Sequence, residues 1–330
     1  MLEDPDHYVK VVAPMVRYSK LPFRVLCRRW GADVVFTPMI MAKDFAQSYR
    51  ARNIEFRTSD GDEDAPLVVQ FAANNGKDLA DAAEYLHGHV QAVDINCGCP
   101  QGWVIKEQLG AGILRSPETI RDMVRAVRER AGMVCSIKIR VDDDMRRTVD
   151  LVRMAEAAGV AWVTVHGRTT AQRANVPADM ERIRIVKDAL SVPVIANGDV
   201  LTPADVERTA RESGTDGCMS ARGILANPAL FAGHEHAPWE CIYDFADIAL
   251  RYTLTQALFH QHICYMTRNR LSRPDFLRLQ NCRSAVELLT ELDEMSPVPI
   301  YNAMSSPSLS TPSPLSAAID AASVSSFVDA

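Results

Sequence analysis

The sequence predicts an α/β protein, a TIM (β/α)8 barrel followed by a small C-terminal helical domain. Eight short apolar, β-branched runs alternate with longer helical patterns from residue 9 to about residue 230. No such run follows residue 243, where only helical patterns continue. Continuous apolar strands between helices indicate a parallel sheet that helices cover. Eight such units fit a TIM barrel, which usually takes about 250 residues.

The expected strands are short and bounded by polar or turn-forming residues. They span 9–13, 34–36, 67–71, 92–95, 134–141, 162–165, 194–196 and 217–220. The expected barrel helices span 20–29, 77–86, 117–130, 146–157, 179–190 and 203–211, with a short helix after the last strand. A doubly wound open sheet is the alternative, but no GxGxxG follows the first strand, which weakens a Rossmann interpretation.

The composition divides the chain into three parts. We expect a catalytic barrel domain over 1–240 and a helical domain over 241–295, with long helices at 244–267 and 274–292. Residues 296–330 are rich in Ser, Pro and Ala and contain no Lys or Arg. Such a segment has little to build a core with, so we expect a disordered tail.

Charge and cysteine usage exclude several classes of protein. The formal net charge of −6 gives no whole-protein attraction to nucleic acid. No apolar run approaches the roughly 20 residues of a membrane span, and the acidic start resembles neither a secretory signal nor a transit peptide. Cys97 and Cys99 are too close for an ordinary disulfide, and no CxxC spacing exists for zinc. We therefore expect a protein without membrane or metal, in the reducing cytoplasm or the nucleus, and nothing indicates its oligomeric state.

Polar residues recur at the carboxyl ends of the expected strands, where TIM barrels place their chemistry. In chain order they are Pro14 and Met15, Gln70, Asn96 to Pro100, Lys138 and Arg140, His166 to Arg168, Asn197 to Asp199, and Ala221 to Gly223. Taken singly, Gln70 could be a satisfied core amide, His166 a capping histidine, and Asn197-Gly198-Asp199 an ordinary turn. Seven polar strand ends on one rim favour a binding site instead.

Two of these groups indicate an anionic ligand. Lys138 and Arg140 share one face of an internal strand, which is costly without an anionic partner. The loops after the seventh and eighth strands contain glycine, and the eighth carries Arg222. Glycine allows backbone N–H groups to approach a phosphate, and arginine adds a charge-assisted pair. The pattern therefore predicts a phosphorylated ligand.

Taken together, the segments resemble the tRNA-dihydrouridine synthase family, over nearly all of residues 8–295. The resemblance is carried by the opening Ala-Pro-Met-Val-Arg-Tyr-Ser-Lys from residue 13, the Asp-Ile-Asn-Cys-Gly-Cys-Pro from residue 94, and Gly-Ala-Gly from residue 110. Lys-Ile-Arg from residue 138, Val-His-Gly-Arg-Thr from residue 165, Asn-Gly-Asp from residue 197 and Arg222-Gly223 follow in the family's order. The opening segment and Phe-His-Gln-His from residue 259 are similar to the eukaryotic subfamily for D-loop positions 20a and 20b. The chain departs from the family by continuing beyond Pro297.

The resemblance implies a barrel that holds FMN, NADPH as reductant, and a helical domain that helps to grip tRNA. It implies that FMN contacts Pro14, Met15, Val16, Gln70, Lys138, His166, Asn197, Gly198, Asp199, Ala221 and Arg222. It also implies that Cys99 is the catalytic cysteine, whereas Cys97 packs in the core. We expect Asn96, Arg140 and Arg168 to bind the substrate.

The chemistry of uracil explains why a cysteine is needed. The C5=C6 bond is conjugated to the C4 carbonyl, so it accepts hydride at C6 and needs a general acid at C5. A thiol serves if it stays protonated, and cations lower the pKa of thiols. We therefore expect Cys99 to be shielded from Lys138 and Arg140. The alternative interpretation is that Cys99 has a structural role only, as a small buried hydrophobic side chain.

A basic stretch in the expected helical domain favours contact with RNA. Residues 251–283 hold one acid, Asp275, and six arginines, with Tyr252, Phe259 and Tyr265 interleaved. The arginines are Arg251, Arg268, Arg270, Arg273, Arg278 and Arg283. A solvated helix face is the alternative interpretation of this stretch. Two other functions stay open, a flavin-dependent reductase of a free pyrimidine or another enone, and a tRNA-binding flavoprotein without turnover.

Overall fold

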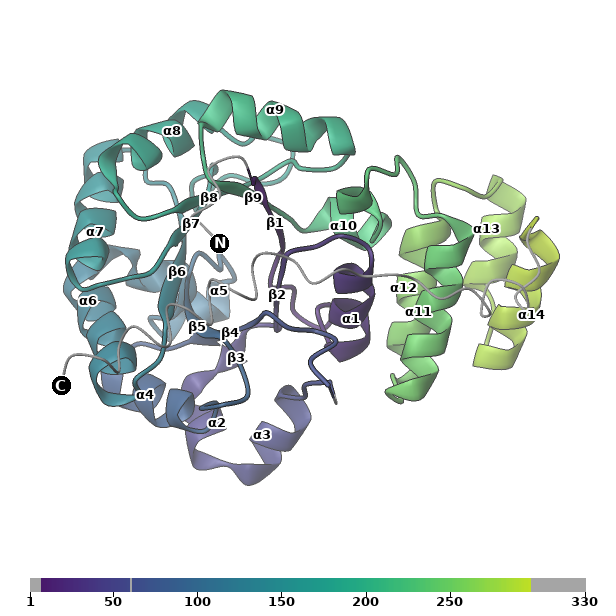
Figure 1. The fold of residues 1–330 in the computed structure, drawn as a ribbon, viewed down its shortest axis with the longest axis horizontal. Coiled ribbons are helices and arrows are strands. Elements are labelled where there is room, and N and C mark those ends of the chain that lie inside the picture. The colour runs from purple at the N-terminus through teal and green to yellow at the C-terminus, as the bar shows by residue number, and fades with distance from the viewer. Residues whose placement is uncertain (1–6, 60, 298–330) are drawn as a thin grey trace.

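The computed structural model describes residues 7–59 and 61–297, a ring of strands with helices around it and a further group of helices beside it (Figure 1). The predicted tail falls largely in 298–330, outside the described residues. No helix in the described part of the chain combines the length and apolar character that crossing a membrane requires.

Eight parallel strands form a closed barrel. They are β1 (Val9–Val12), β2 (Val34–Phe36), β4 (Leu67–Ala72), β5 (Ala92–Cys97), β6 (Cys135–Arg140), β7 (Val163–His166), β8 (Val194–Asn197) and β9 (Gly217–Ser220). The pairings of β1 with β9 and of β2 with β4 close the sheet. A two-residue strand, β3 (Ile40–Met41), adds to the end of β4. The predicted TIM barrel is confirmed, and the open doubly wound sheet is wrong.

The strand register places the predicted polar residues near the carboxyl ends of neighbouring strands. Asn96 is the pairing partner of Lys138, and Arg140 is the partner of His166. His166 in turn pairs with Asn197 on β8. Because all these strands run the same way, their carboxyl ends meet on one rim.

Helices cover the outside of the barrel, and local sequence explains where several begin. They include α1 (Leu21–Arg29), α4 (Gly76–Glu84), α6 (Pro117–Arg125), which continues as one π-helical turn (Ala126–Arg130), α7 (Met145–Ala157), α8 (Met180–Ala189), α9 (Pro203–Ser213) and α10 (Arg222–Ala226). The side chains of Asn75, Asp144 and Asp179 accept backbone N–H bonds at the starts of α4, α7 and α8. Thr202 and Asp205 form a reciprocal capping box at α9.

Short helices that the sequence did not predict follow two of the strands. They are α2 (Ala42–Gln47) and α3 (Tyr49–Glu55) after β3, and α5 (Gly102–Lys106) with a 3-10 helix (Gly110–Arg115) after β5. A further 3-10 turn (Leu230–Ala232) precedes the helical region. These elements are too short for a periodic apolar pattern to reveal them.

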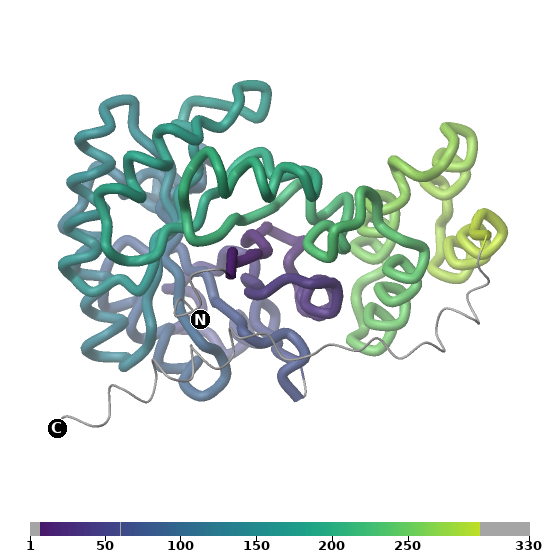
Figure 2. The backbone as a smooth tube through the Cα atoms, turned by 45° about the horizontal axis from the view of Figure 1, so that its top comes forward, coloured from purple at the N-terminus to yellow at the C-terminus, as the bar shows by residue number. Residues whose placement is uncertain are grey.

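The described part of the C-terminal region, residues 239–297, holds four helices where the sequence predicted two. They are α11 (Trp239–Arg251), α12 (Gln256–Thr267), α13 (Arg273–Gln280) and α14 (Ala285–Met295). The single helix expected over 244–267 is wrong because Thr253 adopts a left-handed backbone, with φ 54°, and breaks it. The helix expected over 274–292 is wrong because Ser284 caps a new start at α14. Figure 2 shows these helices as a separate group beside the barrel.

An aromatic cluster joins the barrel to these helices. The buried ring of His262 on α12 stacks on Phe23 of α1 with centroids 4.7 Å apart, and it lies 5.0 Å from Phe245 of α11. Burial lowers the pKa of His262 to about 3, so the ring is neutral and packs as an aromatic group. Tyr265 of α12 donates from its hydroxyl to the Tyr18 hydroxyl at 3.3 Å. The loop after β1 therefore lies directly against the helical region.

Candidate active site at the carboxyl rim of the barrel

Cys99 lies half-buried in the loop that follows β5. The Asn96 side chain holds this loop, since its Oδ1 accepts the backbone N–H groups of Gly98 at 3.1 Å and Cys99 at 2.9 Å. From the other side, the backbone N–H of Ala111 donates to the Cys99 carbonyl at 3.0 Å. Gly110 has φ +55°, and a Cβ there would come within 2.9 Å of the Cys99 Cβ. Only glycine fits this close approach.

Cys97 has a different environment from Cys99. Its side chain is fully buried, and burial raises the pKa of the thiol well above its usual value. A buried thiol of this kind behaves as a small apolar side chain. The structure thus places one cysteine in the rim loop and the other in the core, in agreement with the packing role that the resemblance implied for Cys97.

Three buried polar side chains lie just beneath the Cys99 loop. Gln70 Nε2 donates to Asp94 Oδ2 at 2.8 Å, and Ser136 Oγ donates to Asp94 Oδ1 at 2.7 Å. Asn96 Nδ2 donates to Gln70 Oε1 at 2.8 Å. Asp94 and Ser136 were not among the predicted site residues. The available signal was a carboxylate inside an otherwise apolar strand, two residues before Asn96.

Lys138 and Arg140 use their donors within the rim. Lys138 Nζ donates to Asn197 Oδ1 at 2.8 Å. Burial, followed by repulsion from Arg140, lowers the pKa of Lys138 to about 8. Arg140 donates from Nε to the Gly98 carbonyl at 2.9 Å and from one terminal nitrogen to the Thr169 carbonyl at 3.0 Å. Arg140 therefore clamps the Cys99 loop to the loop after β7.

The expected shielding of Cys99 from these cations stays a prediction. Arg140 lies close to the Cys99 loop, since its Nε donates to the carbonyl of Gly98, the residue before Cys99.

A cationic cavity of about 250 Å³ opens beside this region, at the ends of β6 to β9. Its walls are Arg140, His166, Arg168, Gln172, Arg173, Ala174, Asn197, Gly198, Asp199, Val200, Leu201, Met219, Ala221 and Arg222. Four of these residues are arginines and one is an acid, so the cavity suits an anion. Eight predicted site residues line it. Six lining residues were missed: Gln172, Arg173, Ala174, Val200 and Leu201, which lie in loops, and Met219 in β9.

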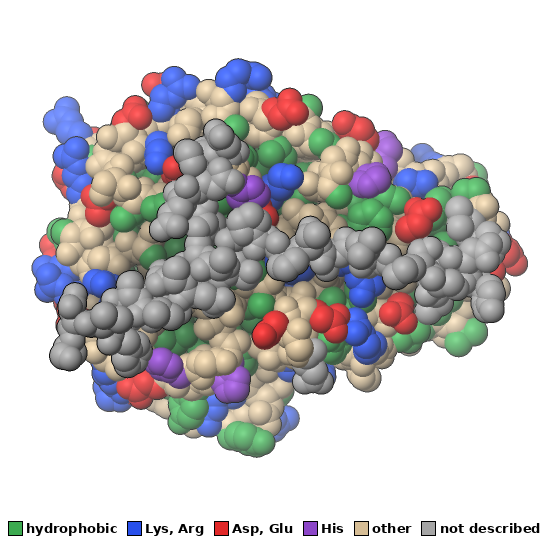
Figure 3. All heavy atoms as spheres, in the orientation of Figure 1, with side chains coloured by type: hydrophobic (Ala, Val, Ile, Leu, Met, Phe, Trp, Pro, Cys, Tyr) green, Lys and Arg blue, Asp and Glu red, His purple; other side chains and the backbone are tan. Residues whose placement is uncertain are grey.

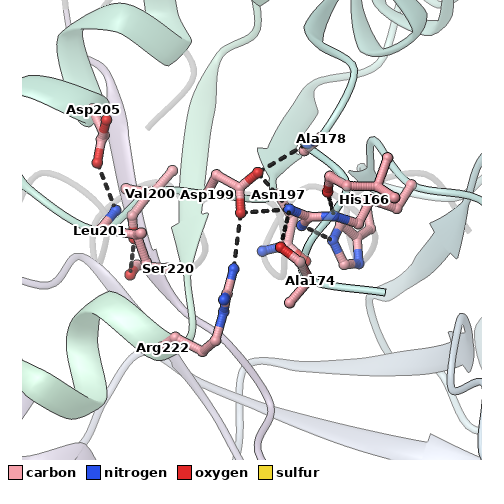
Figure 4. A network of polar contacts seen from close by, with 12 residues as sticks. His166, Ala174, Ala178, Asn197, Asp199, Val200, Leu201, Asp205, Ser220 and Arg222 are labelled. Atoms are coloured by element: carbon pink, nitrogen blue, oxygen red, sulfur yellow. Dashed lines mark hydrogen bonds and ion pairs between the residues drawn. The ribbon is translucent and has the colours of Figure 1, made fainter. Parts of the chain in front are cut away.

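Asp199 organises the arginines of the cavity. Arg168 donates to Asp199 Oδ1 at 2.6 Å, and Arg222 donates to the same oxygen at 2.8 Å. The backbone N–H of Ala178 donates to Asp199 Oδ2 at 2.9 Å, and Figure 4 shows Asp199 between Ala178 and Arg222. Although burial opposes ionisation, the Arg168 and Ala178 hydrogen bonds hold the pKa of Asp199 below its usual value. Asp199 has φ 54°, a backbone strain stored at the rim.

His166 is a neutral acceptor in this cavity. Burial, followed by the charges of Lys138, Arg140, Arg168 and Arg222, lowers its pKa to about 2. Arg168 lies 3.2 Å from His166 Nε2. Arginine only donates, so Nε2 accepts and the ring proton is on Nδ1.

The remaining predicted residues lie elsewhere on the same rim, outside this cavity. Pro14 and Met15 are half-buried in the loop after β1, and Val16 is exposed. The Ser19 hydroxyl accepts the Met15 backbone N–H at 3.0 Å, which shapes that loop. Gln70, Asn96, Cys99 and Lys138 lie at β4 to β6, and the bond from Lys138 to Asn197 connects them with the cavity.

The six arginines of 251–283 do not form one uncompensated patch. Arg251 makes two bonds of 2.8 Å to Glu63, and Arg278 pairs with Glu291 and Glu294. Arg270 donates to the Ala237 carbonyl and lies over the Trp239 ring. Phe259 belongs to the core, where it stacks on Phe245.

Three other arginines of this stretch are unpaired in the part of the chain that the structure describes. Within the described residues, Arg268, Arg273 and Arg283 are exposed and make no ion pair. The face shown in Figure 3 likewise carries both basic and acidic side chains where the atoms are not grey.

No group of three or more His, Cys, Asp or Glu side chains in the described residues is arranged to hold a metal ion. All eight cysteines are free thiols.

Comparisons with known proteins match most of the chain. The family model described as "Dihydrouridine synthase (Dus)" matches residues 11–286. A Homo sapiens protein named tRNA-dihydrouridine(20a/20b) synthase [NAD(P)+]-like is 49% identical over 86% of this chain and 90% of its own. A Rattus norvegicus protein named tRNA-dihydrouridine(16/17) synthase [NAD(P)(+)]-like is 36% identical over 81% of this chain and 62% of its own. Histamine dehydrogenase from Rhizobium sp. 4-9 is similar in fold, with a TM-score of 0.53 and 12% identity over 72% of this chain and 48% of its own.

Proposed function

The chain belongs to the dihydrouridine synthase family, and from that premise we propose that it reduces the C5=C6 bond of uridine in the D-loop of tRNA. The observation that carries the proposal is the placement of one half-buried thiol, Cys99, in a rigidly held loop beside a cationic cavity on the barrel rim. We propose positions 20a and 20b as targets, because identity is 49% to the human relative named for them and 36% to the rat relative named for positions 16 and 17.

The residues of the cavity fit the cofactor that this reaction needs. We propose FMN, whose phosphate end matches a cavity walled by four arginines and one acid. Arg222 and the backbone of Gly198 and Asp199 would hold the phosphate. Asn197, His166, Ala221 and Lys138 would contact the middle of the cofactor, and Gln70, Pro14, Met15 and Val16 its ring. When bound, FMN would supply the hydride that reaches uracil C6, and a nicotinamide, for which we propose NADPH, would reduce the flavin again.

Cys99 would supply the proton. As hydride arrives at C6, negative charge develops at C5 and O4, and the Cys99 Sγ–H gives its proton to C5. The remaining thiolate then takes a proton from solvent. The two backbone bonds to Asn96 and the close packing at Gly110 keep this thiol at one place on the rim. General acids of this kind contribute about 10²–10⁴-fold to rate.

Three rim residues would position the base, although most of their polar atoms are occupied. Asn96 uses Oδ1 for the loop and one N–H for Gln70, which leaves one N–H to reach a base edge. Arg140 uses Nε and one terminal nitrogen for the two loops, which leaves its other terminal nitrogen to bond the base. Arg168 is bound to Asp199 and would act by holding the cavity wall. The base would have to leave the tRNA stack to reach this depth.

The helical region would grip tRNA through Arg268, Arg273 and Arg283, exposed arginines that make no ion pair in the described residues. We propose the barrel and helical domains as the two working parts of the enzyme. We also propose that it works in the cytoplasm or nucleus, where its eight free thiols stay reduced.

The direct test is to map dihydrouridine in tRNA made without modification and then treated with purified protein, FMN and NADPH. The proposal predicts dihydrouridine at 20a and 20b and tRNA-dependent oxidation of NADPH. Reduction of free uracil but not of tRNA would point to a free-pyrimidine reductase. Tight tRNA binding without NADPH oxidation would point to a flavoprotein without turnover.

A further inference from the structure

A single layer of polar side chains crosses the inside of the barrel directly below the Cys99 loop. The strand register places Gln70, Asp94 and Ser136 side by side on β4, β5 and β6. Each of the three is at most 1% exposed. A polar layer this deep in a barrel must satisfy its own hydrogen bonds, because water does not reach it.

The carboxylate of Asp94 fixes the direction of every bond in the layer. Ionised Asp94 only accepts, so both of its neighbours must turn a donor toward it. Gln70 turns Nε2 toward Asp94, at 2.8 Å, and Ser136 turns its hydroxyl, at 2.7 Å. Gln70 must then turn Oε1 the other way.

The orientation of Gln70 in turn sets the orientation of Asn96, which holds the Cys99 loop. Gln70 Oε1 accepts from Asn96 Nδ2 at 2.8 Å, so Asn96 must turn Oδ1 upward. That oxygen accepts the backbone N–H groups of Gly98 and Cys99. The Asp94 carboxylate accepts at one end of this chain, and backbone N–H groups donate at the other end. The side-chain amides of Gln70 and Asn96 therefore each have one orientation that satisfies all of these hydrogen bonds. We call Asp94, Gln70 and Asn96 the amide relay.

The burial of the Asp94 carboxylate at this position costs free energy of folding. It is 0% exposed, and burial raises its pKa to about 6 in spite of hydrogen bonds from Ser136 and Gln70 and the positive charge of Lys138. The other titratable groups that face it are the buried thiols of Cys97 and Cys135. A buried carboxylate lowers stability relative to an apolar side chain, so packing alone does not account for it.

We propose that Asp94 is a positioning residue that holds the Cys99 thiol in place through Gln70 and Asn96, by fixing the orientation of both amides. The proposal rests on the proposed function, in which Cys99 is the proton donor. If the acceptor at position 94 is removed, Gln70 is free to rotate, and Asn96 loses the hydrogen bond that directs Oδ1 to the loop. The loop is then less well held, although its hydrogen bonds with Arg140 and Ala111 remain.

The test compares Asp94→Leu, which has no acceptor, with Asp94→Asn. Asparagine can still accept from Gln70 and donate to the Ser136 oxygen, so it preserves the relay. The first readout is the rate at which iodoacetamide alkylates Cys99, followed by mass spectrometry. It should rise several-fold in Asp94→Leu and stay near the wild-type rate in Asp94→Asn. Leu151→Ala, in the outer helix α7, controls for loss of stability alone and should leave the Cys99 rate unchanged.

The second readout separates the two halves of the reaction in protein loaded with FMN. Reduction of the flavin by NADPH needs no proton from Cys99, so its rate should stay within about threefold of wild type in both Asp94 variants. The rate of tRNA-dependent reoxidation should fall at least about tenfold in Asp94→Leu and stay near the wild-type rate in Asp94→Asn. If Asp94→Leu does not fold, Gln70→Met removes the same connection, and its Cys99 should be alkylated faster.

Two results would overturn the relay. One is an unchanged alkylation rate in the folded Asp94→Leu or Gln70→Met protein. The other is an equal loss of tRNA-dependent reoxidation in Asp94→Leu and Asp94→Asn, which would assign the effect to charge. Failure of the proposed function is distinct from both, since wild-type protein would then form no dihydrouridine at all.

Discussion

The two halves of the barrel rim each contain a buried titratable group, and their pKa values are shifted in opposite directions. At β4 to β6, a buried carboxylate, Asp94, is surrounded by neutral amides and a hydroxyl, and its pKa is raised to about 6. At β7 to β9, His166 lies among cations, and its pKa is lowered to about 2. The first half fixes the place of a thiol, and the second forms a cavity for an anion. We propose that the first half delivers the proton and the second binds the cofactor.

The largest expected effect tests the first half. Cys99→Ala should lower tRNA-dependent reoxidation of the flavin by about 10²–10⁴-fold, because it removes the proposed general acid. The measurement is single-turnover flavin absorbance after mixing reduced protein with unmodified tRNA. Cys97→Ala is the matched control. It should lower thermal stability and change the rate by only a few-fold, and a comparable rate loss in both variants would remove the distinction between the two thiols.

The next effect concerns the ion pairs of the second half. The Arg168 side chain is 4% exposed, so Asp199→Ala leaves its charge buried and unpaired. We expect a loss of about 3 kcal/mol in the free energy of unfolding. The Arg222 side chain is 54% exposed, and Arg222→Ala should change the free energy by about 0.5 kcal/mol or less. Urea denaturation checks both values, and equal losses would contradict the central place of Asp199.

Acid stability contrasts the two halves directly. His166 has a folded pKa of about 2, below its unfolded value of 6.5, so the unfolded chain binds more protons and stability falls as pH drops below 6.5. Asp94 has a folded pKa of about 6, above its unfolded value of 3.8, so its contribution to stability grows as pH falls from 6 toward 3.8.

These opposite slopes should separate in variants without cofactor. Relative to wild type, His166→Gln should gain stability and Asp94→Asn should lose it when the pH falls from 6 to 5, each by at most about 1.4 kcal/mol. Urea denaturation at both pH values gives the comparison, and the other titrating groups cancel in the difference. Shifts of the same sign in both variants would refute the contrast.

The smallest effect tests the arginines outside the barrel. Replacing Arg268, Arg273 and Arg283 together by Ala should lower the slope of log affinity against log salt by about 0.7–0.9 for each phosphate that the protein no longer neutralises. Arg278→Ala is the control, since Arg278 is already paired with Glu291 and Glu294. Filter binding of tRNA at several salt concentrations measures the slope. An unchanged slope in the triple variant would place the tRNA-binding surface elsewhere.

The sequence predicted the barrel and its polar rim because both follow from local patterns. Apolar strands that alternate with helices leave few other folds, and parallel strands bring Asn96, Lys138, His166 and Asn197 to one rim whatever the loops do. It did not predict the break at Thr253, because a left-handed threonine has no sequence signal. It also missed Asp94 as a partner of Gln70, since that bond depends on the register between two strands.

Loop conformation accounts for the remaining differences. Arg140 and Asn96 were predicted to face the substrate, but most of their hydrogen bonds hold the Cys99 loop. Glu63 neutralises Arg251 from a segment 188 residues away, which no count of charge along the chain reveals. Interactions between distant segments are therefore the part that only the folded structure shows.

The division of the rim is tested most directly by adding FMN to Cys99→Ala and Arg222→Ala and measuring tRNA-dependent reoxidation at each concentration. If the halves are separate, Arg222→Ala binds FMN more weakly and recovers most of its rate when FMN is in excess. Cys99→Ala binds FMN as wild type does and stays slow at every concentration. Recovery of Cys99→Ala by excess FMN, or full activity of this variant once loaded, would contradict the account.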